Sequence, residues 1–423
     1  MRRQGRTLWL IAALALGTGC GAADEGGAAA HDPEAAPASA RRALSGAASV
    51  APVLGPSGDA FYTPPGDLSG YKPGDVIWYR PSVFTTDLLL KLPEPVNAWQ
   101  ILYRSTSATG AAMAVSGTVL LPRGFYLGDR PIVGWAPGTQ GMGDSCAVAS
   151  KGMTQGAYYE GGSIKDALSQ GWAVAVTDYQ GLGTPEAHTY VVGRAEGDAL
   201  LDVVRAAVRT PGAGLSATAK VGLYGYSQGG GAAAWAAQLQ PSYAPELDVK
   251  GVAAGGVPSD LVAVKDQNDG GLFVGLVLYA ALGLDAAYPE LRLDSFLNAK
   301  GRAAVPLMRD SCDFFSKAFT HVSDYVSSDP LTTPAWQARM AEQALGASVP
   351  TAPLFLYHSV SDEVVPYAQA AALRDLWCKK GVKVQWANFW FTGHVLGLIQ
   401  GWPAARDYLR GRFLGFPAPT SCP

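Results

Sequence analysis

Ser227 is the centre of the pattern Gly-x-Ser-x-Gly, which runs from Gly225 to Gly229. The chain has 51 glycines, so the pattern alone is weak evidence, but its context strengthens it. An apolar strand pattern at Lys220–Tyr224 precedes it, and the alanine-rich segment Gly231–Leu239, a good helix former, follows it. Small neighbours permit a sharp strand-to-helix turn that exposes the hydroxyl at a helix N-terminus. The context predicts a nucleophilic serine; the alternative is a glycine-rich structural turn.

A serine hydroxyl needs a base that takes its proton. The chain has five histidines: His31, His188, His321, His358 and His394. In hydrolases with this turn, the acid and then the histidine follow the serine along the chain. His394 comes just after the last strong strand pattern, in the loop where the base is expected, whereas His358 precedes the best candidate acid. We therefore predict that His394 is the base; the alternative is a structural histidine.

The acid of such a site holds the imidazole tautomer and stabilises the imidazolium. Asp362 is the first carboxylate after the strand pattern that ends at Tyr357, in a turn-prone stretch. We predict Asp362 as the acid and Glu363 as its main competitor; alternatively both are solvated. Asp178 also follows a strand pattern, but it precedes Ser227, so we interpret it as a structural carboxylate that bonds local backbone.

Acyl chemistry also needs donors for the oxyanion that develops on the substrate. One expected donor is the backbone N–H of Gln228, the residue after the nucleophile, and the second should come from a loop after an earlier strand. The segment Trp135–Asp144 is such a glycine-rich loop, and Thr139 is the predicted donor within it. The alternative is an ordinary turn.

Buried strands must position these residues. Unbroken apolar runs bounded by turn residues are typical of strands that are covered on both faces. They occur at Pro131–Ala136, Ala173–Thr177, Lys220–Tyr224, Val249–Ala254, Pro353–Tyr357 and Val382–Phe391. Between them, Leu200 to Val208 repeat apolar residues at helical spacing, with Asp202, Arg205 and Arg209 on the other face. This alternation predicts an α/β fold with a mostly parallel sheet.

The alternation stops between residues 258 and 350, where no strand pattern is convincing. Leu272–Leu284 is apolar on nearly all sides, and the interval is too long for a loop in a compact domain. We expect a helical insertion. It either extends the core or forms a cap over the site whose apolar side chains bind acyl chains.

The N-terminus has the features of an export signal. Arg2, Arg3 and Arg6 precede the apolar stretch Leu8–Leu16, and small residues lead to Cys20. We predict a signal peptide at 1–19, a flexible tether rich in Ala, Gly and Pro at 20–55, and a folded domain at 56–423. Cys20 is a candidate lipid anchor, although Gly17 stands where such signals usually have leucine. Anchored and freely secreted forms both remain open.

Composition excludes several classes of protein. The 32 Lys and Arg against 35 Asp and Glu give a net charge of −3, without the basic surplus that nucleic-acid binding needs. No apolar run reaches the ~18 residues of a membrane span, so the chain is not polytopic. The usual zinc spacings are absent, and we expect no metal. Beside Cys20, four cysteines predict two disulfides with three possible connectivities: Cys146, Cys312, Cys378 and Cys422.

Together these residues resemble the secretory lipases of the α/β-hydrolase superfamily. The motifs that carry the resemblance are Phe61–Pro65, Gly117–Pro122, Gly138–Gly141, Gly143–Cys146, Thr177–Gly183, Gly225–Gly229, and Asp362 with His394. The resemblance implies an α/β-hydrolase fold, a triad of Ser227, Asp362 and His394, and a helical cap at 258–350. It also implies the disulfides Cys146–Cys312 and Cys378–Cys422. One departure is Pro137, where many members have histidine; a backbone donor at Thr139 would survive that change. Asp144 is the nearest counterpart of an acidic residue that assists the oxyanion in a family member.

We therefore expect an exported serine carboxylester hydrolase, a lipase or esterase, that works through an acyl-enzyme on an ester or lipid substrate without a cofactor. An acyltransferase or peptidase with the same triad remains an alternative, because fold and triad are shared across these chemistries. A third reading, an inactive binding module on a hydrolase fold, is disfavoured because such modules usually lose the serine or the histidine.

Overall fold

The structure is a computed structural model, and it describes residues 50–156 and 158–423. The predicted signal peptide, Cys20 and the tether up to residue 49 lie outside the described residues. Val53 and Leu54, which lie within the range expected for the tether, form a short parallel strand beside Trp78 and Tyr79. Backbone hydrogen bonds at a sheet edge do not require the apolar pattern from which strands were predicted.

The described chain forms one ten-stranded sheet, in the order β1-β2-β3-β4-β6-β5-β7-β8-β9-β10. Its strands are β1 Val53–Leu54, β2 Val76–Ser82, β3 Val96–Thr106, β4 Ala112–Pro122, β5 Ile132–Ala136, β6 Ala173–Thr177, β7 Lys220–Tyr226, β8 Asp248–Gly255, β9 Leu354–Ser359 and β10 Val384–Phe389. Strands β5 to β10 pair in parallel, which confirms the predicted mostly parallel sheet.

The sequence analysis missed the antiparallel part of the sheet, where β2, β3, β4 and β6 pair in succession. Strands β3 and β4 interrupt their apolar residues with polar ones that are nevertheless buried, among them Gln100, Ser105, Ser116 and Thr118. Their polar atoms are paired inside the protein; Ser116, for example, donates a hydrogen bond to Asp178. A search for unbroken apolar runs therefore passes over these strands.

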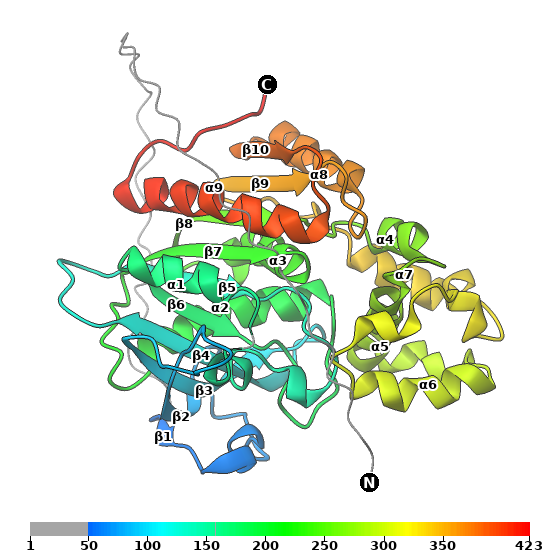
Figure 1. The fold of residues 1–423 in the computed structure, drawn as a ribbon, viewed down its shortest axis with the longest axis horizontal. Helices are drawn as coiled ribbons and strands as arrows, with labels where there is room; N and C mark the ends of the chain where they lie inside the picture. The colour runs from blue at the N-terminus through cyan, green and yellow to red at the C-terminus, as the bar shows by residue number, and fades with distance from the viewer. Residues whose placement is uncertain (1–49, 157) are drawn as a thin grey trace. The chain divides into compact units, whose positions relative to one another are not determined.

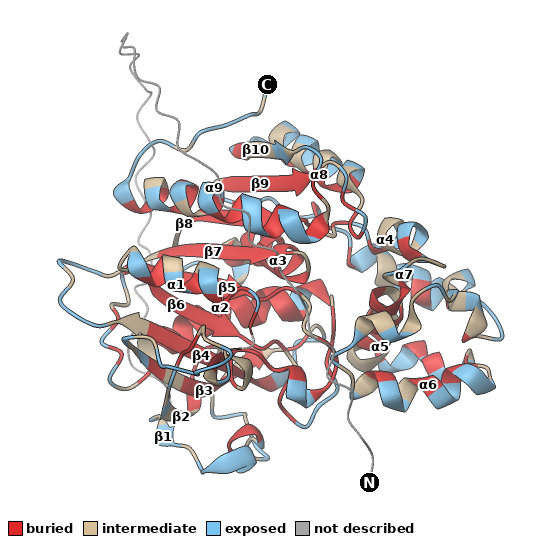
Figure 2. Ribbon diagram, in the orientation of Figure 1, coloured by how far each residue is buried: buried red, intermediate tan, exposed pale blue. Residues whose placement is uncertain are grey.

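Helices cover both faces of the sheet (Figure 1). The helices of the described chain are α1 Gly161–Ser169, α2 Gly193–Arg209, α3 Gln228–Tyr243, α4 Leu261–Asn268, α5 Val274–Ala287, α6 Ala299–Arg309, α7 Pro334–Glu342, α8 Tyr367–Lys379 and α9 His394–Leu414. Helices α1 and α9 share one core on one face, and α2, α3 and α8 share another on the opposite face. The central strands β5, β6, β7 and β9 are buried almost throughout, whereas β1 is exposed and β10 is mostly intermediate (Figure 2).

The interval between β8 and β9 is helical, as expected. It holds α4 to α7 and short 3-10 turns, and its one described strand-like feature is the isolated bridge between Leu297 and Val326. These helices pack in a separate hydrophobic cluster, to which Tyr190, Val192 and Val364 also contribute, and they lie beyond the carboxyl end of β9 (Figure 1). The segment is therefore placed where the side chains at the strand ends lie.

One bent helix pair in this interval, Val274–Ala287 with Pro289–Ser295, has the length and composition of a membrane span. Among residues 50–156 and 158–423, no single helix meets those criteria.

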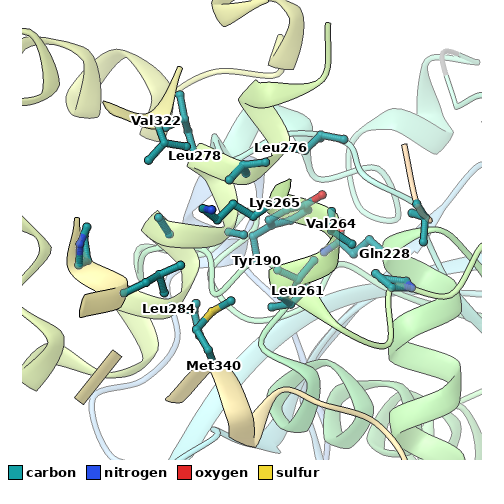
Figure 3. A pocket seen from close by; sticks show the side chains of 18 of the residues that line it. Tyr190, Gln228, Leu261, Val264, Lys265, Leu276, Leu278, Leu284, Val322 and Met340 are labelled. Atoms are coloured by element: carbon teal, nitrogen blue, oxygen red, sulfur yellow. The ribbon is translucent and has the colours of Figure 1, made fainter. Parts of the chain in front are cut away.

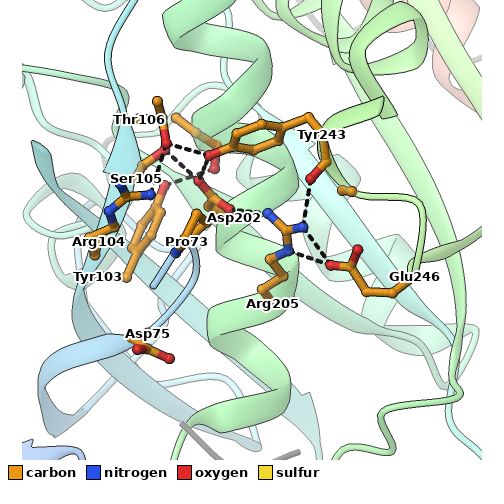
Figure 4. Close-up of polar contacts among 12 residues, drawn as sticks. Pro73, Asp75, Tyr103, Arg104, Ser105, Thr106, Asp202, Arg205, Tyr243 and Glu246 are labelled. Carbon is orange, nitrogen blue, oxygen red and sulfur yellow. Dashed lines mark hydrogen bonds and ion pairs between the residues drawn. The ribbon is translucent and has the colours of Figure 1, made fainter. Parts of the chain in front are cut away.

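The polar side of α2 is buried rather than solvated. Asp202 accepts hydrogen bonds from the Ser105 hydroxyl (2.7 Å), the Tyr243 hydroxyl (2.6 Å) and Arg205 Nη1 (2.8 Å), and Arg205 Nε also donates to Glu246 (2.6 Å; Figure 4). Burial of a charge is tolerated when it is paired and hydrogen-bonded in this way. The helical period therefore located α2 correctly, while its second face contacts protein instead of water.

Asp198, on the same helix, differs from Asp202. It is fully buried, and among the described residues neither of its carboxyl oxygens accepts a hydrogen bond. Burial, followed by repulsion from Asp202, raises the pKa of Asp198 to about 8. The folded protein therefore retains this proton at neutral pH, whereas an unfolded Asp, with an ordinary pKa of about 3.9, has lost it.

Since the folded state binds the additional proton between about pH 4 and pH 8, its stability should fall as the pH rises through this window. We expect the substitution Asp198→Asn to make the free energy of unfolding less dependent on pH. Urea unfolding at about pH 6 and about pH 8.5 measures this. The control Asp375→Asn removes an exposed carboxylate and should leave the pH dependence of the free energy of unfolding as in the wild type. If Asp198→Asn and the wild type show the same pH dependence, the pKa assigned to Asp198 is contradicted.

Candidate active site

Ser227 occupies a strained turn between β7 and α3. Its backbone angles are φ 60° and ψ −125°, outside the regions that non-glycine residues usually adopt. A Cβ atom on Gly225 would lie 2.0 Å from the Gly229 carbonyl oxygen, and one on Gly229 would lie 2.0 Å from the Ala136 carbonyl oxygen. Both glycines are therefore required by close backbone contact, and the turn has the shape expected of a nucleophile elbow.

His394 and Asp362 are in direct contact. His394 Nδ1 lies 2.7 Å from Asp362 Oδ2, and the backbone N–H groups of Val364 and Val365 donate to Asp362 Oδ1 at 2.9 and 2.7 Å. Burial alone would raise the pKa of Asp362, but hydrogen bonds from His358 and His394 outweigh it and hold the pKa well below its ordinary value. The carboxylate is thus ionised and oriented toward the imidazole.

His358 is a second imidazole on the same carboxylate. Its Nε2 lies 3.2 Å from Asp362 Oδ2 and 3.0 Å from the Val365 carbonyl oxygen, and its side chain is completely buried. Its location before the acid in the chain led us to set it aside as the base. Its contact with Asp362 could not be predicted, because that contact depends on how the chain turns after β9.

Glu363, the competitor for the role of acid, faces a different atom of the same histidine. Its carboxylate accepts a hydrogen bond from the backbone N–H of His394 (2.9 Å), the first residue of α9. A negative charge at a helix N-terminus stabilises the helix. Glu363 therefore holds the end of α9, and Asp362 contacts the imidazole ring.

The end of β8 at Gly255, with Gly256 after it, lies between the Ser227 turn and His394. The Ser227 N–H donates to the Gly255 carbonyl oxygen (2.9 Å), and the next residue, Gly256, abuts the imidazole. A Cβ atom on Gly256 would lie 3.2 Å from His394 Cε1. The Tyr226 hydroxyl donates to the His394 carbonyl oxygen at 2.6 Å. Ser227, Asp362 and His394 thus lie at one edge of the sheet, after the carboxyl ends of β7, β9 and β10.

The predicted oxyanion donors lie in two elements held by hydrogen bonds. The loop after β5 is fixed because Gly138 N–H and Trp135 Nε1 donate to the two oxygens of Glu160, at 2.7 and 2.8 Å. Among the described residues, the backbone N–H groups of Thr139 and Gln228 have no hydrogen-bond partner. Both are free to donate to a substrate. Glu160 was not predicted from the sequence. Burial raises the pKa of Glu160 to about 7.

The cysteines pair as the resemblance implies, Cys146 with Cys312 and Cys378 with Cys422. The first bond joins the loop after β5 to the helical segment between β8 and β9, and Met142 N–H donates to the Ser311 carbonyl oxygen beside it (2.9 Å). The second joins α8 to the C-terminal segment. Two disulfides fit a protein that folds in an oxidising compartment.

A pocket opens beside Ser227 and Gln228 and extends beneath the helical segment (Figure 3). Its walls are mostly apolar and come largely from α4, α5 and α7, and Tyr190 and Val191 also line it. Apolar wall residues labelled in Figure 3 are Leu261, Val264, Leu276, Leu278, Leu284, Val322 and Met340. The pocket can therefore accommodate a hydrophobic group next to the serine.

Two other expectations concern carboxylates and metals. Asp178 is buried and accepts hydrogen bonds from the Ala149 N–H (2.7 Å) and the Ser116 hydroxyl (2.8 Å), as expected of a structural carboxylate. Asp144 is exposed and accepts from the Gly183 N–H (3.2 Å). Within the part of the chain that the structure describes, no group of three or more His, Cys, Asp or Glu side chains could hold a metal ion.

A mostly parallel sheet with helices on both faces, and a serine on a strained turn after a central strand, define an α/β-hydrolase. The chain belongs to the secretory lipase family, whose family model matches residues 147–420. It is accordingly a carboxylester hydrolase of the lipase type.

Similar proteins place this chain among lipases. It is 35% identical over 266 residues to the secreted triacylglycerol lipase LIP5 of Malassezia furfur, covering 60% of this chain and 69% of that protein. It is 30% identical over 390 residues to a probable inactive lipase of Mycobacterium tuberculosis, covering 87% and 84%. The closed-state structure of Candida antarctica lipase A superposes with a TM-score of 0.75 at 26% identity, covering 85% of this chain and 88% of the other.

The two neighbouring acids can be distinguished by amide substitutions. We expect Asp362→Asn to lower kcat for ester hydrolysis by about 10⁴-fold, because the amide no longer stabilises the imidazolium. Glu363→Gln should change kcat only a few-fold, because its amide oxygen can still accept from the His394 N–H. Steady-state hydrolysis of a p-nitrophenyl ester measures both variants. The reverse ranking would assign the role of acid to Glu363.

Proposed function

We propose that the chain hydrolyses acyl esters through a triad of Ser227, His394 and Asp362 and a covalent acyl-enzyme. The Ser227 hydroxyl adds to the ester carbonyl while His394 takes its proton. The tetrahedral intermediate collapses, and the alcohol leaves with that proton. Water then attacks the acyl-enzyme with His394 again acting as base, which releases the carboxylic acid and restores the serine.

The observation that carries the proposal is the 2.7 Å contact between His394 Nδ1 and the ionised, buried Asp362. An acceptor on Nδ1 places the histidine proton there and leaves Nε2 unprotonated, as a general base requires. One relative is named a probable inactive lipase, so family membership alone does not establish catalysis. The three side chains, which follow β7, β9 and β10 at one edge of the sheet, support activity in this chain.

The free backbone N–H groups of Gln228 and Thr139 are the proposed oxyanion donors. Gln228 is the first residue of α3, so its N–H points out of a helix N-terminus where partial positive charge favours an anion. Loss of a single donor of this kind costs about 10²- to 10³-fold in kcat in other hydrolases. Backbone donors also explain how the site operates with Pro137 in place of a histidine.

Replacement of the nucleophile tests the mechanism directly. We expect Ser227→Ala to lower kcat by about 10⁴- to 10⁶-fold, since removal of a triad member leaves only binding and oxyanion stabilisation. Labelling of the protein by a fluorophosphonate should disappear at the same time. A matched variant, Ser216→Ala, removes an exposed serine and should keep both activities. Labelling of Ser227→Ala at another serine would contradict the assignment.

We further propose that residues 258–350 form a cap whose underside binds the acyl chain. The pocket wall beneath α5 is apolar and begins at Ser227, where the acyl carbon must be attached. Each methylene that leaves water contributes about 0.8 kcal/mol, so a chain that fits this wall is bound more tightly as it lengthens. Gly275 is unsuitable as a probe of this pocket, because a Cβ atom there would lie 1.9 Å from the Phe314 carbonyl oxygen.

Leu278 is the better probe, because its side chain lines the pocket. We expect Leu278→Trp to shorten the space and shift the preference toward shorter p-nitrophenyl esters. Each methylene that no longer fits should lower kcat/KM about fourfold, the equivalent of 0.8 kcal/mol. The control Leu307→Trp enlarges an exposed leucine on α6. A Leu278→Trp profile identical to wild type, with only a lower Tm, would place this helix in the core.

A further inference from the structure

Glu196 is a buried glutamate in the first turn of α2, directly behind the proposed oxyanion site. Its Oε1 accepts a hydrogen bond from Gln228 Nε2 at 2.6 Å and another from the Val191 N–H at 2.9 Å. Gln228 and Val191 both line the pocket beside Ser227. One carboxyl oxygen therefore joins Gln228, the residue after the nucleophile, to Val191 in another segment that lines the pocket.

That segment is strained and reaches the second donor. Val191 has φ 54°, a left-handed conformation that is a genuine outlier for a β-branched residue. The preceding residue, Tyr190, places its hydroxyl 2.7 Å from Thr139 Oγ1. A strained backbone of this kind persists only when its surroundings hold it, and the hydrogen bond from the Val191 N–H to Glu196 is such a restraint.

From these contacts we infer that Glu196 is a positioning residue for the oxyanion site, fixing Gln228 directly and Thr139 through Val191 and Tyr190. The inference rests on the proposed function, because it takes the N–H groups of Gln228 and Thr139 as the donors. Oxyanion stabilisation depends on donors that are held in place before the reaction, so loss of the carboxyl should affect the transition state more than substrate binding.

The charge of Glu196 should also affect how the reaction depends on pH. Burial raises its pKa to about 8, against the opposing effect of its bonds from Gln228 and Val191. The ionisable groups that face it are Tyr179 and Tyr190, whose own pKa values lie well above 10, so both are neutral in this range. Glu196 is thus neutral at pH 7, and above pH 8 it becomes a negative charge behind the developing oxyanion, which opposes the reaction.

The test compares Glu196→Ala and Glu196→Gln with wild type. Glutamine keeps an oxygen that can accept from Gln228 and Val191 but cannot ionise, whereas alanine removes the acceptor. Asp198→Asn is the matched control: a buried carboxyl two residues along the same helix, also with its pKa raised to about 8, that faces Arg194, Arg104 and Asp202 instead of the site. Hydrolysis of p-nitrophenyl butyrate is measured from about pH 6 to about pH 9.5.

We expect Glu196→Ala to lower kcat about 10- to 100-fold at pH 7 with little change in KM, and Glu196→Gln to restore kcat to near wild type. Wild type and Asp198→Asn should lose about tenfold in kcat between pH 7 and pH 9, as a group with a pKa near 8 ionises, and Glu196→Gln should not.

Either of two results overturns the inference. One is a Glu196→Ala enzyme with unchanged kcat and only a lower Tm; the other is a Glu196→Gln enzyme with the same alkaline loss as wild type. If Glu196→Ala does not fold, the alkaline limb of Glu196→Gln decides alone. Failure of the proposed function is separate: it would appear as activity in Ser227→Ala, whereas an inactive Ser227→Ala with normal Glu196 variants would refute only the role of Glu196.

Discussion

An ionised carboxylate inside a protein must be surrounded by donors, and Asp362 imposes that requirement on this fold. Its two oxygens take hydrogen bonds from two imidazoles and two backbone N–H groups, which come from the end of β9, the turn after it and the start of α9. These elements must therefore meet at one point of the sheet edge. His394 is fixed there by Asp362 on its ring and by Glu363 on its backbone, so its remaining nitrogen has a defined direction.

The other buried carboxyls of the site differ in charge. Glu160 and Glu196 each accept two hydrogen bonds, yet desolvation dominates and raises both pKa values to about 7 and about 8. The difference from Asp362 lies in the donors, because imidazoles that can carry positive charge stabilise the anion more than amides and indoles do. The site thus contains an ionised carboxylate beside the proposed base, and behind the proposed oxyanion donors it contains carboxyls whose ionisation burial suppresses, Glu160 in part and Glu196 more fully. This suits a reaction that creates a cation at the first place and an anion at the second.

Much of this arrangement could be predicted from the sequence where chemistry and chain order restrict the choices. Ser227, Asp362 and His394 follow from the order of nucleophile, acid and base, and the apolar runs predict β5 to β10 because strands covered on both faces exclude polar residues. Glu160, Glu196 and His358 could not be predicted, because their roles arise from contacts between residues far apart in the chain or from a local turn. Strands β2 to β4 were missed for a related reason: their buried polar side chains find partners only after folding.

The disulfide between Cys146 and Cys312 has a mechanical consequence. It fastens the helical segment between β8 and β9 to the loop that follows β5, with the two Cα atoms 5.5 Å apart, and the segment is otherwise continuous with the sheet only at its two ends. These are its three covalent attachments; the segment also packs against Tyr190 and Val364, and Gln343 accepts a hydrogen bond from the Gly193 N–H (3.0 Å). If the segment moves outward, either Cys312 stays in place or the loop after β5, which carries Thr139, moves with it. A swing that keeps the oxyanion donors in register must therefore pivot near Cys312 and displace the far side, where α4 and α7 lie.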